Sequence, residues 1–439
     1  MKILLNAALA AAAVTLSGCP ITGGAKYTVG GTVTGLSGSG LVLQLNGGDS
    51  LSFNGNGTFD FGTRLENGAA YSVTVMTQPS NPAEVCTVRN GSGAIDKTSV
   101  TNVIVVCTQV GRFAYIANRQ SNSISGFAID PSSGQLVPLS GSPFASNGTT
   151  PTALTVDPDG QFLYVANSGS NSVSAYSIDA TTGALTAVGF PTAAGTGPGA
   201  VTVDPTNHFL YVANLTSNNV SAFSISAGTL TPIVDSPFGV GAEPASLAID
   251  PNGNFLYVTN FNSNSVSVFL IDPASGMLSV ISGSPFAAGA GPVSIAIDPT
   301  DAFAFVANNT GQTIASYALN ATTGALTPSP GPLAAGSNAE AVAVDPSGSY
   351  VVAANAGAPN QVAAYTITPA SGVLMVSSTS AAGSLPIAVA IDPSGHFLYA
   401  VNFNSNDVSA YTLSASGALT PVAGSPFAVG TQPHSIAID

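Results

Sequence analysis

Three ionisable residues, Glu243, Glu340 and His434, are the main candidates for chemistry because of their places in a repeated segment. Glu340 and His434 each follow the residue that opens an alternating apolar run, and Glu243 directly precedes that residue in another copy. We expect all three at the mouth of a central channel, where a carboxylate and an imidazole can act as general base and orienter. Glu340 and His434 belong to two copies that are separated by one full copy, so we expect no direct hydrogen bond between these two residues. Catalysis, ligand contact and a solvated rim are the three interpretations open for these residues.

Positive charge is confined to the beginning of the chain. In the other copies the place of Glu340 and His434 is held by uncharged residues, namely Thr152, Gly199, Ala245, Val293 and Ile387. All seven Lys and Arg residues lie in the first 119 positions: Lys2, Lys26, Arg64, Arg89, Lys97, Arg112 and Arg119. Beyond them the only basic residues are three histidines. Phosphorylated sugars and nucleic acids are bound through cationic donors. The sequence therefore predicts no nucleic-acid partner and argues against phosphosugar chemistry.

The segment that positions these residues recurs seven times and reads most clearly from Pro244 to Asp272. One asparagine marks each copy, with spacings of 49, 47, 46, 48, 47 and 47 residues: Asn118, Asn167, Asn214, Asn260, Asn308, Asn355 and Asn402. A period of this length without a helical pattern predicts a propeller blade of four strands. We expect strands at 246–250, 255–259, 266–271 and 277–281, an Asp-Pro turn between the first two, and a loop at 284–286.

The two ends of the repeat region complement each other. The first copy begins at its second strand, near residue 112, and the last stops after its first strand, which ends at Asp439. If the final strand joins the first three, one blade closes the ring from both termini and leaves no open edge. Residues 112–439 then form seven blades of about 47 residues each.

The residues Tyr257-Val258-Thr259-Asn260 spell YVTN, and the surrounding unit resembles the YVTN repeats of lactonase-like propellers. The resemblance covers 112–439 and implies a seven-bladed β-propeller, in a superfamily that includes sugar-lactone hydrolases and envelope proteins of unknown role. It also implies that phosphogluconolactonase members carry arginine and histidine after the proline that opens strand one. This chain departs from that pattern at most copies, and Ala339 replaces the proline before Glu340.

Other polar residues of the repeats are expected to be structural. His208 and His396 occupy the same turn in copies four apart, on opposite sides of a seven-membered ring, so they cannot share a metal. The aspartates before proline are expected to cap their own turns: Asp157, Asp204, Asp250, Asp298, Asp345 and Asp392, with Asp439 ending the chain. We predict neither a metal site nor a cofactor.

The first residues have the pattern of an exported lipoprotein. Lys2 precedes an apolar run from Ile3 to Leu16, which is too short to span a bilayer and is typical of a secretory signal. The tetrad that ends at Cys19 resembles a bacterial lipobox, so residues 1–18 are predicted to be removed and Cys19 to be lipidated. An ordinary signal cleaved nearby is the alternative. Residues 19–26 would be a tether.

Residues 27–108 differ in composition from the repeats and predict a small β-sandwich, Ig-like or transthyretin-like. Their two cysteines, Cys86 and Cys107, are the only ones left once Cys19 is lipidated. An exported chain meets an oxidising compartment, so we expect a disulfide between them.

Together these features predict an all-β protein of the bacterial cell envelope, anchored by lipid alone to the outer membrane on its periplasmic or surface side. We expect it to bind or scaffold a protein, glycan or small molecule at one propeller face. Twelve of the 16 acids after residue 119 fall at one end, so the opposite end, with Asn/Ser loops such as 261–264, is the expected binding face. The alternative function is hydrolysis of an uncharged or sugar lactone.

Overall fold

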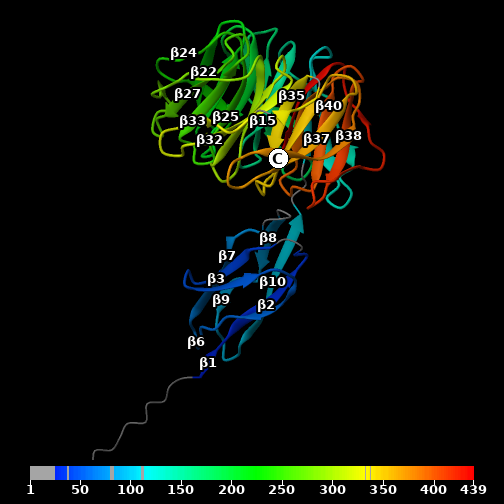
Figure 1. The fold of residues 1–439 in the computed structure, drawn as a ribbon. Helices are drawn as coiled ribbons and strands as arrows, with labels where there is room; N and C mark the ends of the chain where they lie inside the picture. The colour runs from blue at the N-terminus through cyan, green and yellow to red at the C-terminus, as the bar shows by residue number, and fades with distance from the viewer. Residues whose placement is uncertain (1–24, 37–38, 80–83, 110–112, 332, 337) are drawn as a thin grey trace, which may run out of the picture. The chain divides into compact units, whose positions relative to one another are not determined.

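The computed structural model describes residues 25–36, 39–79, 84–109, 113–331, 333–336 and 338–439, all of them in strands, turns and loops. The chain divides into two compact units, Met1–Gln109 and Val110–Asp439, which Figure 1 colours blue to cyan and cyan to red. None of the described segments is an apolar helix long enough to cross a membrane. The predicted signal segment and Cys19 lie outside the described residues.

The first unit contains two four-stranded sheets, ordered β5-β2-β10-β8 and β4-β3-β7-β9, and the pair β1-β6. Alternate apolar residues of both sheets, such as Val33 and Leu43, enter one core. The predicted disulfide is present, because Cys86 and Cys107 are register partners on β8 and β10 with an S–S distance of 2.04 Å. The strands are β1 (Lys26–Tyr27), β2 (Val29–Thr34), β3 (Leu41–Leu45), β4 (Asp49–Phe53), β5 (Gly57–Asp60), β6 (Leu65–Glu66), β7 (Ala70–Thr77), β8 (Glu84–Arg89), β9 (Ser92–Ala94) and β10 (Val100–Gln109).

The second unit contains seven antiparallel sheets, which are the blades of a propeller. The first strands of the blades are β15 (Pro151–Val156), β20 (Pro198–Val203), β25 (Pro244–Ile249), β30 (Pro292–Ile297), β35 (Ala339–Val344), β39 (Pro386–Ile391) and β44 (Pro433–Ile438). The second strands are β16 (Phe162–Asn167), β21 (Phe209–Asn214), β26 (Phe255–Asn260), β31 (Phe303–Asn308), β36 (Tyr350–Asn355), β40 (Phe397–Asn402) and β11 (Phe113–Asn118).

The outer half of each blade follows the same order. The third strands are β17 (Ser172–Ile178), β22 (Asn219–Ser226), β27 (Ser265–Ile271), β32 (Thr313–Leu319), β37 (Gln361–Ile367), β41 (Asp407–Leu413) and β12 (Ser123–Ile129). The fourth are β18 (Leu185–Ala187), β23 (Thr229–Pro232), β28 (Leu278–Val280), β33 (Leu326–Pro328), β38 (Leu374–Ala381), β42 (Leu419–Pro421) and β13 (Leu136–Pro138).

The four strands expected in each unit are confirmed to within about two residues at their ends, but each third strand has a further partner. In six blades a two-residue strand that follows the fourth strand in the sequence also pairs with the third strand. These short strands are β14 (Phe144–Ala145), β19 (Thr192–Ala193), β24 (Phe238–Gly239), β29 (Phe286–Ala287), β34 (Leu333–Ala334) and β43 (Phe427–Ala428). The segment around residue 286 was predicted as loop because two residues are too few for a period-2 pattern. In the blade of β35, the longer β38 serves both purposes.

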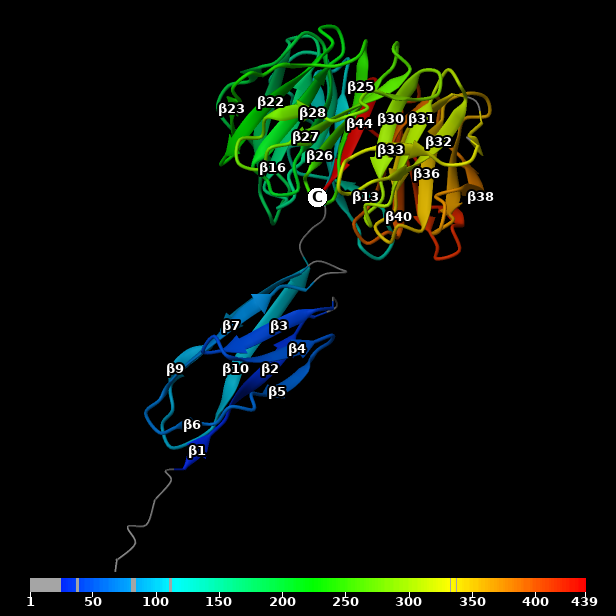
Figure 2. The ribbon, with the colours of Figure 1, turned by 60° about the vertical axis from the view of Figure 1, so that its left-hand side comes forward.

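The predicted closure of the ring is confirmed. Strand β44 from the C-terminus pairs antiparallel with β11, with Ile436 opposite Ile116. Figure 2 shows β44 in red within the second unit, among strands of earlier blades. Asp439 also accepts a hydrogen bond from the backbone N–H of Phe113, which repeats the Asp-Pro turn contact of the other blades with a carboxylate from the other end of the chain.

Neighbouring blades contact each other through a glycine and a tyrosine. The glycine in the turn between the third and fourth strands has a positive φ, as at Gly324 (φ 73°), where a Cβ atom would lie 2.5 Å from the ring of Phe255 of the preceding blade. The Tyr257 hydroxyl of that blade donates to the Gly324 carbonyl oxygen at 3.2 Å. Tyr399 makes the same bond to Gly134 at 2.9 Å across the seam between last and first blades. The repeat therefore encodes the blade packing as well as the blades.

Candidate functional site

The innermost strands of the second unit surround a cavity of ≈ 540 Å³. The structure places on its wall all seven residues that follow the first position of a first strand: Thr152, Gly199, Ala245, Val293, Glu340, Ile387 and His434. They come together because first strands lie next to one another around the axis, so equivalent positions form a ring. Most of this ring is apolar, and its two ionisable members, Glu340 and His434, are the only titratable side chains that it contributes.

Arg119 also lines the cavity, although the sequence has no Lys or Arg after this position. Arg119 follows β11, and its backbone N–H donates to the Gln432 carbonyl oxygen at 2.9 Å. The loops after second strands and the starts of first strands lie at the same end of the blades, so this arginine joins the ring. Arg119 further lines a polar pocket of ≈ 480 Å³ with Asn122, Thr150 and others. The cavity therefore contains one fixed positive charge.

His434 is held in one tautomer by the neighbouring blade. Its Nδ1 lies 2.8 Å from the Thr152 carbonyl oxygen, which can only accept, so Nδ1 carries the proton and Nε2 has a free lone pair. Burial lowers the pKa of His434, the Thr152 contact partly offsets this, and the charge of Arg119 lowers it further. The ring of Phe403 packs edge-on against the imidazole, with centroids 6.2 Å apart. His434 is therefore a neutral, oriented base near pH 7.

Glu340 has the opposite tendency. It is on β35, and its Oε1 accepts a hydrogen bond from Asn309 Nδ2 at 2.7 Å. Burial raises the pKa of Glu340, and the Asn309 bond only partly offsets the rise. Because Glu340 is bound to Asn309 and His434 to Thr152, the two candidates have separate partners, as the intervening strand β39 led us to expect. A carboxyl that holds its proton longer than usual and an imidazole that loses its proton sooner face the same cavity.

Glu243 is not among the described residues that line the cavity, and its place at the channel mouth stays a prediction. The backbone at Glu243 has a φ of 54°, and its N–H donates to Asn218 Oδ1 at 2.8 Å. Ala245, two residues later, lines the cavity.

The sequence analysis missed Arg119, Asn309 and Phe403, which share one position. Each directly follows the asparagine that marks its copy. The other copies have Ser168, Leu215, Phe261 and Ala356 there, and Ser168 and Leu215 also line the cavity. The sequence signal was therefore present as a second ring of positions, one residue after the repeat asparagine.

The Asn/Ser loops at this end are partly structural. Their left-handed asparagines accept backbone N–H bonds from the loop that precedes the next first strand, as Asn264 Oδ1 does from Gly291 at 2.8 Å. Asn122, Asn171, Asn218 and Asn406 act in the same way. These side chains therefore stabilise the loops at this end of the blades, and the expected binding of a partner by the Asn/Ser loops stays a prediction.

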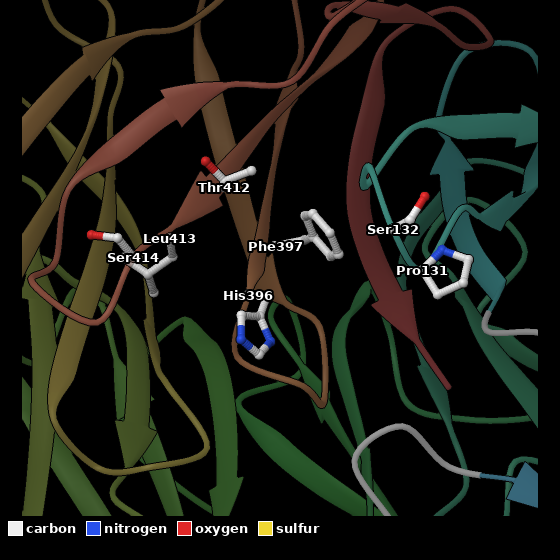
Figure 3. Close-up of a pocket in the computed structure, with 7 residues that line it drawn as sticks. All are labelled: Pro131, Ser132, His396, Phe397, Thr412, Leu413 and Ser414. Carbon is white, nitrogen blue, oxygen red and sulfur yellow. The ribbon is translucent and has the colours of Figure 1, made fainter. Parts of the chain in front are cut away.

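The two turn histidines are remote from this chemistry. The backbone N–H groups of His208 and His396 donate to Asp204 and Asp392, the caps of their own turns. His396 borders a separate surface pocket of ≈ 430 Å³, where Figure 3 shows its imidazole between Pro131 and Ser414, below Phe397. It is the only ionisable side chain in that lining, so the pocket offers no acid–base pair.

The aspartates before proline cap turns as predicted. Asp157 Oδ1 accepts the N–H groups of Gln161 and Phe162 at 2.7 and 2.8 Å, and equivalent bonds recur in the other blades. Among the residues that the structure describes, no three His, Cys, Asp or Glu side chains are grouped to hold a metal ion.

Comparisons with known proteins agree with this architecture. A candidate 6-phosphogluconolactonase from Bacteroides uniformis is 22% identical, with a TM-score of 0.67 over 75% of this chain and 100% of that one. A second from Bacteroides fragilis is 21% identical, with a TM-score of 0.68 over 75% and 98%. The periplasmic gluconolactonase of Pseudomonas aeruginosa is 20% identical, with a TM-score of 0.66 over 74% and 98%. These likenesses show the fold, and a search of curated proteins found no match.

The model of the family described as "Lactonase, 7-bladed beta-propeller" matches residues 93–197, 139–241, 190–338 and 286–434. The overlapping matches extend over most of the chain and contain all the residues that line the cavity except two, Ser435 and Ile436. The chain therefore belongs to the lactonase family of seven-bladed β-propellers.

Proposed function

We propose that the protein hydrolyses a sugar lactone in the central cavity of the propeller. The observation that carries the proposal is the pairing of a neutral, oriented His434 with a Glu340 of raised pKa on one cavity wall. Two titratable groups whose pKa values are shifted in opposite directions are typical of a site that needs a base and an acid at the same pH. Family membership favours hydrolysis over a purely binding or scaffolding role.

Hydrolysis of a lactone ring needs a proton removed at one point and supplied at another. In our proposal Nε2 of His434 takes a proton from water while the water oxygen bonds to the lactone carbonyl carbon. The bond between that carbon and the ring oxygen then breaks, and protonated Glu340 donates its proton to the departing oxygen. The products are a hydroxy acid, an imidazolium and a carboxylate. Solvent in the cavity returns the proton from His434 to Glu340.

Arg119 determines which lactones fit. Within the described part of the chain its guanidinium has no acidic partner, although the protein has a formal charge of −14. An unpaired guanidinium at a cavity wall binds carboxylate or phosphate strongly. We therefore propose that Arg119 binds an acidic group of the substrate. The lack of cationic side chains was the argument against phosphorylated lactones, and with Arg119 in the cavity that argument no longer holds.

The test is hydrolysis of 6-phosphogluconolactone and gluconolactone, followed by acid release with the spontaneous rate subtracted. Glu340→Gln and His434→Ala should each lower kcat/KM about 100-fold or more, as expected for loss of a general acid or base. His396→Ala is the matched control, because it removes an imidazole outside the cavity. Turnover of neither substrate by the wild type would favour a binding role instead. Turnover that survives both cavity substitutions would contradict the site.

The cellular location is a separate proposal. We propose that the chain is exported and anchored to the cell envelope through lipid on Cys19, so that the reaction takes place outside the cytoplasm. The lipobox-like tetrad supports this, as does the disulfide of Cys86 and Cys107, a bond that persists in oxidising compartments. Cys19→Ser should release the protein from membranes. Retention after a carbonate wash would mean that the anchor is elsewhere.

A further inference from the structure

Two buried carboxyl groups face each other across one seam of the propeller, remote from the cavity. Asp250 directly follows β25, the first strand of its blade, and Asp301 is in the corresponding turn of the next blade. Their exposed fractions are 0% and 7%. Asp250 Oδ2 and Asp301 Oδ1 are excluded from solvent and have no hydrogen-bond partner among the described residues. Unpartnered buried carboxylate oxygens are costly, so this seam needs an explanation.

A second seam of the same protein has a hydrogen donor at this contact. There Asn207 occupies the place of Asp301, with a φ of 59° against 61°. Asn207 Nδ2 donates to Asp157 Oδ2 at 2.7 Å and to Asp159 Oδ2 at 3.0 Å. Asp157 and Asp159 are the equivalents of Asp250 and Asn252. At that seam the later blade supplies a hydrogen donor to a carboxylate of the earlier one, whereas the place of Asn207 is held in other blades by glycine: Gly160, Gly253, Gly348 and Gly395.

Asp301 removes that donor and substitutes an acceptor. Its Oδ2 now accepts a bond from Asn252 Nδ2 at 2.9 Å, the reverse of the direction at Asn207. The equivalence of the two seams places an Asp301 oxygen against Asp250 Oδ2, where Asn207 presents an N–H group. Two ionised carboxylates in this position would repel each other, and one added proton restores a hydrogen bond of the same form.

The other charged or titratable groups around the pair offer no alternative donor. Asp298, in the same turn as Asp301, adds negative charge. Tyr257 lies close enough that the charges of both aspartates, after burial, raise its pKa. Its hydroxyl proton is already donated to the Gly324 carbonyl oxygen. The basic side chains after residue 112 are Arg119 and the three histidines, and none of them contributes to the pKa of either aspartate.

We infer that Asp250 and Asp301 share a single proton, so that the contact between these two blades is a pH-sensitive element of the propeller. Burial is the main cause that raises the pKa of both groups, and the charge of Asp250 raises that of Asp301 further. The folded protein then holds a proton that the unfolded chain releases near pH 4. Stability from the pair is complete below that pH and is lost as pH rises through the raised pKa. A proton is favoured over a metal ion because the Asn207 seam spans the same gap with one hydrogen.

The test measures the melting temperature of the propeller in the full chain from pH 4 to pH 9 in buffer with EDTA. The melting temperature of the wild type should decline by about 2–3 °C between the low- and high-pH ends because of this pair. Asp301→Asn restores the arrangement of Asn207 and should remove that decline. Asn207→Asp should create a similar decline at the second seam, which keeps the test decisive if Asp301→Asn fails to fold. Asp235→Asn is the control, since Asp235 is exposed and has a similar left-handed φ of 64°.

Three results would overturn the inference. The first is an Asp301→Asn variant whose pH dependence equals that of the wild type. The second is an Asn207→Asp variant that gains none. The third is stabilisation of the wild type, but not of Asp301→Asn, when CaCl₂ replaces EDTA, because that would place a cation between the carboxylates. The melting readout is independent of the proposed hydrolysis, so failure of either leaves the other standing.

Discussion

The Nδ1 atom of His434 lies 2.8 Å from the carbonyl oxygen of Thr152, and this bond joins the last strand of the chain to the first complete blade. The strand that closes the ring therefore also carries the proposed base. Its orientation depends on a backbone atom 282 residues earlier in the sequence. Ring closure and the proposed chemistry therefore depend on the same strand.

The pH dependence of hydrolysis should be bell-shaped. Activity should fall as pH drops through the pKa of His434, because the protonated imidazole cannot accept a proton. Since that pKa is lowered, the fall should lie below the ordinary histidine value of about 6.5. Activity should fall again as pH rises through the raised pKa of Glu340, because the carboxylate cannot donate. Initial rates from pH 4 to 7.5 test this, and the residual activity of Glu340→Gln should keep the acidic limb and lack the alkaline one.

Arg119→Gln should lower kcat/KM for 6-phosphogluconolactone by about 10- to 150-fold. One charge-assisted hydrogen bond is worth roughly 1.5–3 kcal/mol, and 1.4 kcal/mol corresponds to a factor of ten. Gluconolactone, which has no anionic group, should change by less than about threefold. The matched control is Arg89→Gln, which removes an exposed arginine from β8 of the first unit. Equal losses for both substrates would assign Arg119 to the reacting carbonyl instead.

Ile436→Ala should destabilise the propeller by about 2–4 kcal/mol. Ile436 is 9% exposed and packs in the apolar cluster between the last and first blades, where loss of an isoleucine leaves a cavity. Val137→Ala, on the outer strand β13, is the control because Val137 is 53% exposed. Denaturant unfolding measures both. A cost no larger than that of the control would show that closure by β44 contributes little to stability.

Cys86→Ser together with Cys107→Ser should destabilise the first unit by about 3 kcal/mol. The bond closes a loop with a sequence separation of 21 residues, and the chain-entropy model gives this magnitude for such a loop. The propeller transition should keep its midpoint, since the cysteines are in the core of the first unit. Calorimetry on the full chain tests this, and a loss confined to the propeller would contradict it.

Most of the fold could be read from local patterns. Tyr257-Val258-Thr259-Asn260 and its six equivalents define the strand that is buried on both faces, and the Asp-Pro pairs define its turn. Ring closure followed as well, because the first copy lacks the strand that the last one supplies. These features are local or repeated, so each copy confirms the others. The two-residue strand β29 (Phe286–Ala287) escaped prediction because it is shorter than any periodicity.

What the sequence determined about the site was the ring of positions after the first residue of each first strand, including Glu340 and His434. What only the tertiary structure decided was which other residues reach that ring. In the sequence Arg119 lies at the start of the repeat region, far from His434. In the structure the blades are arranged around one axis, and Arg119 and His434 line the same cavity. Glu243 is two residues from a wall position but is not among the described residues that line the cavity. The proton shared by Asp250 and Asp301 likewise depends on two turns 51 residues apart meeting across a seam. The burial of a side chain and the charges around it depend on its neighbours in space. A sequence repeat determines where the strands are, but it does not determine which side chains meet between neighbouring blades.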